Sequence, residues 1–368
     1  MQSFLRPALC ALLVAGALQG QPTNEPIDFQ KARQLLERRQ RGGTLTESEN
    51  AYLEAARAAR RRPTGGGAVA GQRPAPAHLT PLCDLTAADR YEGEDGGLYG
   101  GGHNMPPETQ RRAAAAQVAR IRPLNAQGEP DEDGIIGFIA ISMSNATQEF
   151  SRFKQLADAS PLKSSKVRIV DCAQGGQAMA EWAPAKAHPW EEAKRRLTTA
   201  GVSADQVQAA WIKLANKAPA GSLPDHARKL ERDTLAVLHN ARAQFPNLRL
   251  VYFGSRTYGG YANGPLNPEP YAYESAFAAR WLIQRQIQGD PELAESKVPV
   301  LLWGPYLWAD GPSGRKLDGL VWNRSDFGPD GVHPSDSGRQ KVATLLLDFL
   351  STDPLAKLWF SGRAAANQ

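Results

Sequence analysis

The chain has 368 residues, of which 42% are hydrophobic and 22% are charged. This composition is typical of a globular protein and excludes a wholly disordered or collagen-like chain. The formal charge of +5 lies in the first 75 residues, which hold 11 basic and 6 acidic side chains, so the rest of the chain is neutral. A basic, nucleic-acid-binding core therefore has no support, and we expect no nucleic-acid partner.

The first twenty residues have the pattern of a secretory signal. Arg6 precedes an apolar stretch over residues 8–18, and small residues follow it. The stretch is shorter than the roughly 20 apolar residues that span a bilayer, and Cys10 lies inside it, where lipidation is not expected. We expect a signal peptide over residues 1–20, a secreted or periplasmic protein, and no integral membrane segment after cleavage. An uncleaved anchor is the alternative.

Two cysteines, Cys83 and Cys172, remain after removal of the signal. In an exported protein they could form a disulfide, or each could be a buried apolar thiol, and the sequence leaves both possibilities open. No Cys/His spacing resembles a zinc or iron–sulfur site. We therefore expect no metal. We also expect no cofactor, since the glycines after the second strand have no Gly-x-Gly-x-x-Gly or Walker lysine spacing that would indicate a nucleotide.

The N-terminal third of the chain is expected to hold little of the main core. Residues 21–62 predict a helical hairpin, in which Thr46 and Glu49 have the spacing of a capping box. Residues 63–78 are rich in Gly, Ala and Pro and predict a linker. Residues 79–130 predict an irregular, glycine-rich segment that leads into the main domain.

From residue 131 onward, short apolar runs alternate with amphipathic segments. The expected strands cover residues 134–141, 167–170, 207–212, 248–253 and 298–303, and the expected helices cover residues 148–157, 191–199, 230–243, 273–288 and 337–350. This alternation predicts a three-layer α/β/α sandwich with a mostly parallel five-stranded sheet. The domain is expected to span residues 131–355, with a tail over 356–368. Ligands bind such sheets beyond the carboxyl ends of the strands.

Polar residues and glycines follow the first three strands. Ser144 lies between a strand and a helix, where it could present its hydroxyl to a substrate or only cap the helix. Gly176, after the second strand, could bring a backbone N–H close to a ligand or form a plain turn. After the third strand, Lys213 and Asn216 could donate to a developing oxyanion or be ordinary loop residues.

Asp330 and His333 form the most specific pattern in the chain. They lie three residues apart in a loop stiffened by Gly and Pro, directly before the last helix. A carboxylate at this spacing can accept a hydrogen bond from the imidazole, which fixes the tautomer and leaves the other ring nitrogen free as a base. His103 is a rival base, but it lies in a glycine-rich stretch that orients an imidazole poorly.

In this order, Ser144, Gly176, Asn216 and the Asp330/His333 pair resemble the four sequence blocks of the SGNH/GDSL hydrolase family, over about residues 131–351. The resemblance implies a flavodoxin-like sandwich and an esterase. It also implies that Ser144 is the nucleophile and His333 the base, with Asp330 orienting the imidazole. The backbone N–H groups of Ser144 and Gly176 and the amide of Asn216 would form the oxyanion hole.

The resemblance has two departures. Ser142-Met143-Ser144 stands where the family has Gly-Asp-Ser, and Leu214-Ala215-Asn216-Lys217 stands where it has Gly-x-Asn-Asp. The third block is therefore the weaker match, and the Asp330/His333 block is the stronger one.

Asn104, Arg256 and Tyr258 are candidates for substrate binding. Arginine beside aromatic rings suits a carboxylate-bearing or sugar-like substrate. The alternative for Arg256 is an ion pair with Glu274 that holds the loop. The expected substrate is a small-molecule or carbohydrate ester, with acyl and acetyl esters of carbohydrates as the class of interest.

The sequence as a whole predicts an exported serine esterase. The first alternative is a non-catalytic protein on the same fold that binds a glycan or a surface, since the departures from the family blocks permit a loss of turnover. A metal-dependent phosphoesterase is a third and weaker possibility.

Overall fold

The computed structural model describes residues 28, 31–32, 35, 38, 45–61 and 78–362. The chain forms two compact units, Met1–Gly67 and Ala68–Gln368. The predicted signal peptide, most of the predicted linker and residues 363–368 lie outside the described residues. Within the described part of the chain, no helix is both long enough and apolar enough to cross a bilayer.

The smaller unit contains the helix α2 (Glu47–Arg61). The predicted capping box is present, because the Thr46 amide donates to Glu49 Oε2 over 2.8 Å and the Glu49 amide donates to Thr46 Oγ1 over 3.2 Å. Leu53 of α2 is buried in one small cluster with Leu35 from the preceding helical residues. The hairpin as a whole stays a prediction, because much of residues 21–44 lies outside the described residues.

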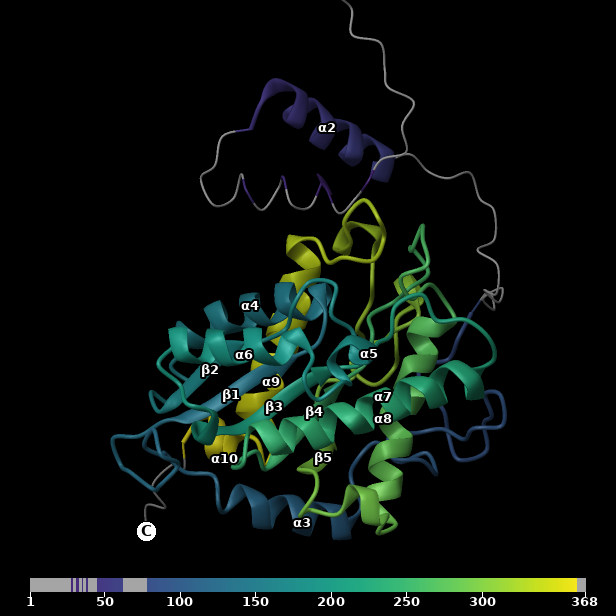
Figure 1. The fold of residues 1–368 in the computed structure, drawn as a ribbon. Helices are drawn as coiled ribbons and strands as arrows, with labels where there is room; N and C mark the ends of the chain where they lie inside the picture. The colour runs from purple at the N-terminus through teal and green to yellow at the C-terminus, as the bar shows by residue number, and fades with distance from the viewer. Residues whose placement is uncertain are drawn as a thin grey trace, which may run out of the picture. The chain divides into compact units, whose positions relative to one another are not determined.

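The larger unit is built on a sheet of five parallel strands (Figure 1). The strands are β1 (Ile136–Ile141), β2 (Val167–Asp171), β3 (Val207–Lys213), β4 (Leu250–Gly254) and β5 (Val300–Trp303). Their order is β2-β1-β3-β4-β5. Every residue of β1, β3 and β4 is buried, as expected for strands covered on both faces. The predicted fold class is confirmed.

Helices cover both faces of this sheet. One layer contains α3 (Glu108–Val118), α4 (Ser144–Asp158), α9 (Asp336–Thr352) and α10 (Lys357–Phe360). The other contains α5 (Met179–Trp182), α6 (His188–Thr199), α7 (Leu223–Gln244) and α8 (Tyr271–Ile287). Short 3₁₀ turns cover Ala204–Gln206, Pro291–Leu293, Gly311–Ser313 and Arg324–Asp326.

The two-residue period of a strand divides the core between these layers. In β1, Phe138 and Ala140 pack with the α4 and α9 layer, whereas Ile139 and Ile141 pack with the α7 and α8 layer. The chain that leaves β1 continues into α4, which begins at residue 144. Because all five strands are parallel, their carboxyl ends lie at one edge of the sheet.

Two of the predicted domain boundaries are wrong. The segment 79–130 is not wholly irregular, because it contains α3, whose Ala114 and Val118 are buried in the main core. The predicted tail begins too early, because Trp359 and Phe360 of α10 are also buried there. Neither helix has a clear apolar period, since α3 is mostly alanine and polar residues and α10 has only four residues.

The two cysteines are free and buried. Of the two possibilities that the sequence leaves open, the structure therefore shows separate buried thiols. Burial raises the pKa of the Cys83 thiol to about 12. At that pKa the thiolate, which is the reactive form, is scarcely populated at neutral pH.

Candidate active site

Ser144 is placed by the turn between β1 and α4. The preceding residue, Met143, has extended backbone angles (φ −100°, ψ −170°), and Ser144 is the first helical residue. The first backbone N–H groups of a helix have no partner within it, and they carry the positive end of the helix dipole. The Ser144 hydroxyl therefore lies at a helix start that favours negative charge.

Ser144, His333 and Asp330 form a continuous hydrogen-bonded chain. Ser144 Oγ lies 2.7 Å from His333 Nε2, and His333 Nδ1 lies 2.5 Å from Asp330 Oδ2. The serine and the histidine are 189 residues apart in the sequence. The structure thus brings together the three residues predicted for nucleophilic catalysis, in the order that the chemistry requires.

Asp330 is held as a carboxylate. Partial burial acts to raise its pKa, but hydrogen bonds from the His333 ring and from the Val332 and His333 amides outweigh this and lower the pKa to about 2. The two amides donate to Asp330 Oδ1 over 3.0 Å each. An ionised acceptor at Nδ1 keeps the proton on that nitrogen and leaves Nε2 free to accept the serine proton.

The loop that carries His333 is fixed from two sides. Asn145 Nδ2 donates to the Val332 carbonyl over 2.7 Å, and the Gly328 amide donates to the His333 carbonyl, also over 2.7 Å. Gly331 has φ +69°, and a Cβ there would approach the Tyr261 carbonyl oxygen to 1.7 Å. Only glycine therefore fits at this point of the loop. The role of Asn145 was missed in the sequence, because its partner is nearly 190 residues away.

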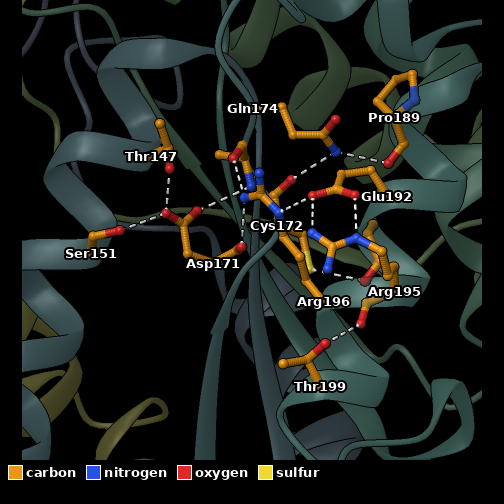
Figure 2. Close-up of polar contacts among 12 residues, drawn as sticks. Thr147, Ser151, Asp171, Cys172, Gln174, Pro189, Glu192, Arg195, Arg196 and Thr199 are labelled. Atoms are coloured by element: carbon orange, nitrogen blue, oxygen red, sulfur yellow. Dashed lines mark hydrogen bonds and ion pairs between the residues drawn. The ribbon is translucent and has the colours of Figure 1, made fainter. Parts of the chain in front are cut away.

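The loop after β2 presents Gly176 at the same edge of the sheet. Gly176 is exposed and has φ +78°, a conformation that only glycine adopts without strain. The loop is braced from α6, where Arg196 Nη1 donates to the Asp171 and Ala173 carbonyls over 3.0 and 2.8 Å (Figure 2). Gln174 Nε2 adds a bond of 2.8 Å to the Pro189 carbonyl (Figure 2).

Asn216 is engaged by neighbouring helices. Its Nδ2 donates to Asp233 of α7 over 2.5 Å, and its Oδ1 accepts from the Ala180 amide of α5 over 2.9 Å. Among the hydrogen bonds of the described residues, none joins Asn216 to Ser144. The amide therefore ties α5 to α7, and its predicted role as an oxyanion donor stays a prediction that rests on its remaining N–H.

Lys213 is not available to a substrate. Its ammonium lies 2.7 Å from both carboxylate oxygens of Glu149, and neither side chain has any exposed surface. Burial lowers the pKa of Lys213 to about 8, against the opposing effect of Glu149. The pair joins Lys213, at the end of β3, to Glu149 of α4. Ser142 Oγ also donates a hydrogen bond to the Lys213 carbonyl. The suggested role of Lys213 as an oxyanion donor is thus wrong.

The predicted substrate contact of Asn104 has no support. Its Nδ2 donates to the Cys83 carbonyl over 2.7 Å, and its Oδ1 accepts from the Leu98 amide over 3.1 Å. The glycine-rich segment that contains it packs against β5 and α8. Trp303 Nε1 donates to the Leu98 carbonyl over 2.8 Å, and Arg280 binds Glu94. The Asn104 amide thus holds this segment together.

Arg256 and Tyr258 follow β4 and lie near the carboxyl edge of the sheet. Tyr258 is partly buried, with its ring 5.1 Å from that of Tyr261. The alternative pairing of Arg256 with Glu274 is wrong, because Glu274 binds Tyr91 Oη and His226 Nε2, each at 2.6 Å. The acidic groups whose charges act on Arg256 are Glu149, Glu269 and Asp330. One of these acids, Asp330, belongs to the Ser144–His333–Asp330 chain.

Residues suited to a metal do not gather at this edge. Among the described residues, no group of three or more His, Cys, Asp or Glu side chains is arranged to hold a metal ion. The arrangement instead provides a hydroxyl, an aligned base and an ionised acid.

No family model and no curated protein matches the chain. Among solved structures, the chain is similar to a protein from Arabidopsis thaliana, with 16% identity, a TM-score of 0.31 and coverage of 55% of this chain and 67% of that one. It is also similar to a Bacteroides fragilis protein provisionally named an acylhydrolase (13% identity, TM-score 0.35, coverage 68% and 100%). A third similar structure is a protein from Slackia heliotrinireducens that is provisionally named an SGNH hydrolase. Its identity is 16%, its TM-score is 0.32, and the match covers 59% of this chain and 100% of that one.

At TM-scores of 0.31 to 0.35 the likenesses carry no argument about the chemistry of this chain. The fold and the site together define an α/β protein with an aligned serine, histidine and aspartate at the carboxyl edge of a parallel sheet.

Proposed function

We propose that the protein is an exported serine hydrolase that cleaves ester bonds. The observation that carries the proposal is the hydrogen-bonded chain from Ser144 Oγ through His333 to Asp330, with distances of 2.7 and 2.5 Å. A serine hydroxyl is a weak nucleophile alone and becomes a strong one when an adjacent base takes its proton. Export rests on the signal-like first twenty residues.

In the first half of the reaction, Ser144 Oγ attacks the ester carbonyl and its proton passes to His333 Nε2. Asp330 stabilises the imidazolium that forms, and the carbonyl oxygen becomes an oxyanion. The intermediate then collapses, the bond to the alcohol oxygen breaks, and the alcohol leaves with the proton from Nε2. The products of this half are the free alcohol and an acyl ester on Ser144.

In the second half, a water molecule takes the place of the alcohol. His333 Nε2 accepts a proton from the water as its oxygen attacks the acyl-serine carbonyl. The second tetrahedral intermediate collapses, Ser144 Oγ leaves and recovers the proton from Nε2, and the carboxylic acid is released.

The oxyanion would be held by backbone donors at the sheet edge. The Ser144 N–H at the start of α4 and the Gly176 N–H in its braced loop are the two main candidates, and the free N–H of Asn216 is a third. Loss of one such donor typically costs roughly 10²- to 10³-fold in rate, so the scheme does not depend on Asn216 alone.

A polar groove along the helix that begins with Ser144 supports a hydroxyl-rich alcohol as the leaving group. The groove has a volume of about 600 Å³ and lies between α4 and α9, starting one turn after Ser144 and three residues after His333. Its lining offers hydroxyl, amide and charged groups: Thr147, Gln148, Ser151, Arg152, Asp336 and Arg339. Such groups suit an acylated or acetylated carbohydrate, which is the substrate class that we propose.

A fluorophosphonate probe, which reacts with activated serines, tests the proposal. The wild-type protein should be labelled and should hydrolyse 4-nitrophenyl acetate, and Ser144→Ala should do neither. Ser313→Ala, at an exposed serine in a 3₁₀ turn, is the matched control and should behave as the wild type. A folded wild-type protein that is not labelled and hydrolyses no ester in a panel would instead support a non-catalytic binding protein.

A further inference from the structure

Arg256 places a cation near Ser144 at the carboxyl edge of the sheet. It follows Gly254, the last residue of β4, which pairs in register with Lys213, the last residue of β3. Only β3 separates β4 from β1, the strand that leads to Ser144. Adjacent strands lie about 4.8 Å apart, so the two strands that carry these residues are about 10 Å apart.

The Arg256 guanidinium is buried without a hydrogen-bond partner. The residue is 4% exposed, its Nε has no partner, and no hydrogen bond or ion pair of the described residues involves the guanidinium. Other buried arginines differ. Arg280 binds Glu94 and the Asp95 carbonyl, and Arg315 binds Asp318 and main-chain carbonyls. An unpaired buried cation is costly, so a fold that retains one needs a reason.

Three acids act on Arg256 through their charges: Glu149, Glu269 and Asp330. The charge of the first, Glu149, is already neutralised. Both of its carboxylate oxygens lie 2.7 Å from the Lys213 ammonium, in a pair that is wholly buried. This pair has no net charge. Arg256 therefore adds a cation that Glu149 does not balance.

The other two acids, Glu269 and Asp330, already accept hydrogen bonds from other groups. Glu269 accepts hydrogen bonds from the Gly259 amide, from Trp308 Nε1 and from the Tyr273 amide, at 2.7, 2.8 and 3.1 Å. Asp330 binds His333, whose imidazolium it must stabilise during catalysis. Among the described residues, none of these three carboxylates forms an ion pair with Arg256, so its guanidinium has no direct counter-ion.

We propose that Arg256 binds a carboxylate of the substrate and so selects esters that carry an anionic group at a fixed distance from the cleaved bond. The inference rests on the proposed esterase function and narrows its substrate class. A guanidinium presents parallel N–H groups that match the two oxygens of a carboxylate. The carboxylate can belong to the acyl group, as in a half-ester of a dicarboxylic acid, or to the alcohol, as in an acylated sugar acid.

The acyl side is tested with two 4-nitrophenyl esters of nearly equal size, the hemiglutarate and the pentanoate. The readout is the ratio of their kcat/KM values, from which any general loss of activity cancels. We expect the wild type to favour the anionic ester about tenfold or more, mainly through KM. Arg256→Gln should bring the ratio to about one, and Arg256→Lys should retain part of the preference.

The alcohol side is tested in the same way with the acetyl esters of 3-hydroxybenzoate and 3-hydroxybenzamide. Arg112→Gln is the matched control for both pairs, because Arg112 is an exposed arginine on α3 and should leave both ratios unchanged. A preference that depends on Arg256 in either pair supports the proposal and identifies which side carries the carboxylate.

Two outcomes overturn the proposal. One is a wild-type protein with no preference for the anionic ester in either pair, which needs no variant to fold. The other is an Arg256→Gln protein that loses rate equally on charged and neutral esters, because Arg256 would then support the site as a whole. These outcomes can be told apart from a failure of the proposed esterase function, because in that case the wild type would not react with the fluorophosphonate probe.

Discussion

Asn145 and Val332 join the two halves of the site through one hydrogen bond, from Asn145 Nδ2 to the Val332 carbonyl, over 2.7 Å. The residue after the serine therefore holds the residue before the histidine. The distance between Ser144 Oγ and His333 Nε2 depends on how α4 is placed against the loop before α9. This bond fixes that placement from within the core, since Asn145 is only 3% exposed.

Replacing Asn145 by Ala should lower kcat about 10- to 100-fold with a smaller effect on KM, because small misplacements of reacting groups are costly in rate. It should also destabilise the fold by roughly 1–3 kcal/mol, because a buried carbonyl loses its partner. The measurements are steady-state kinetics and urea unfolding. Asn263→Ala is the control, since the exposed Asn263 side chain donates to Pro329 of the same loop. Equal kinetic effects of the two substitutions would show that Asn145 does not position the loop.

Gly176→Ala should reduce kcat by roughly 10²-fold, because strain at φ +78° would shift the N–H that we assign to the oxyanion. The strain itself should cost about 1–2 kcal/mol of stability. Two controls separate these effects. Gly175→Ala has neither positive φ nor nearby atoms, and Gly201→Ala has similar strain at φ +69° away from this loop. If Gly201→Ala loses as much activity as Gly176→Ala, strain alone explains the result.

Lys213→Met should destabilise the protein by about 3–5 kcal/mol, because it leaves the Glu149 carboxylate buried and unpaired. The double variant Lys213→Met/Glu149→Leu should recover most of that loss, since an apolar pair has no charge to bury. Urea unfolding of the wild type, both single variants and the double variant gives the coupling energy. Additive losses in the double variant would mean that the two side chains do not stabilise each other.

The sequence was sufficient for the sheet and for the aligned triad, for different reasons. Apolar runs predict buried strands directly, and parallel strands must place their carboxyl ends at one edge. Ser144, Asp330 and His333 could therefore be expected to meet there. Asp330 and His333 are also close in the sequence, so their contact is local.

Contacts between distant side chains could not be predicted in this way. The amide of Asn216 and the ammonium of Lys213 find partners on helices, Asp233 and Glu149, which depend on how α7 and α4 pack against the sheet. The pairing of Arg256 with Glu274 was wrong for the same reason, because nothing local indicates that Glu274 binds His226. Charge type alone suggests partners, and only packing selects between them.

Asp171 predicts a specific dependence of stability on pH. Burial raises its pKa from 3.8 to about 6, in spite of hydrogen bonds from Thr147 and Ser151 (Figure 2). The native state therefore holds this proton more tightly than the unfolded chain does. The resulting stabilisation, at most about 3 kcal/mol, is fully present below about pH 4 and is lost as the pH rises through about 6.

Asp171→Asn removes the titrating group and keeps a polar side chain of similar shape in the same contacts. The free energy of unfolding of the wild type minus that of this variant should fall as the pH is raised from 4 to 7, as measured by urea unfolding at each pH. Asp133→Asn, at a fully exposed carboxyl, is the control for the loss of a carboxylate at the surface. A difference for Asp171→Asn that rises with pH would mean that the folded protein favours the charged carboxylate, and that the hydroxyls of α4 outweigh its burial.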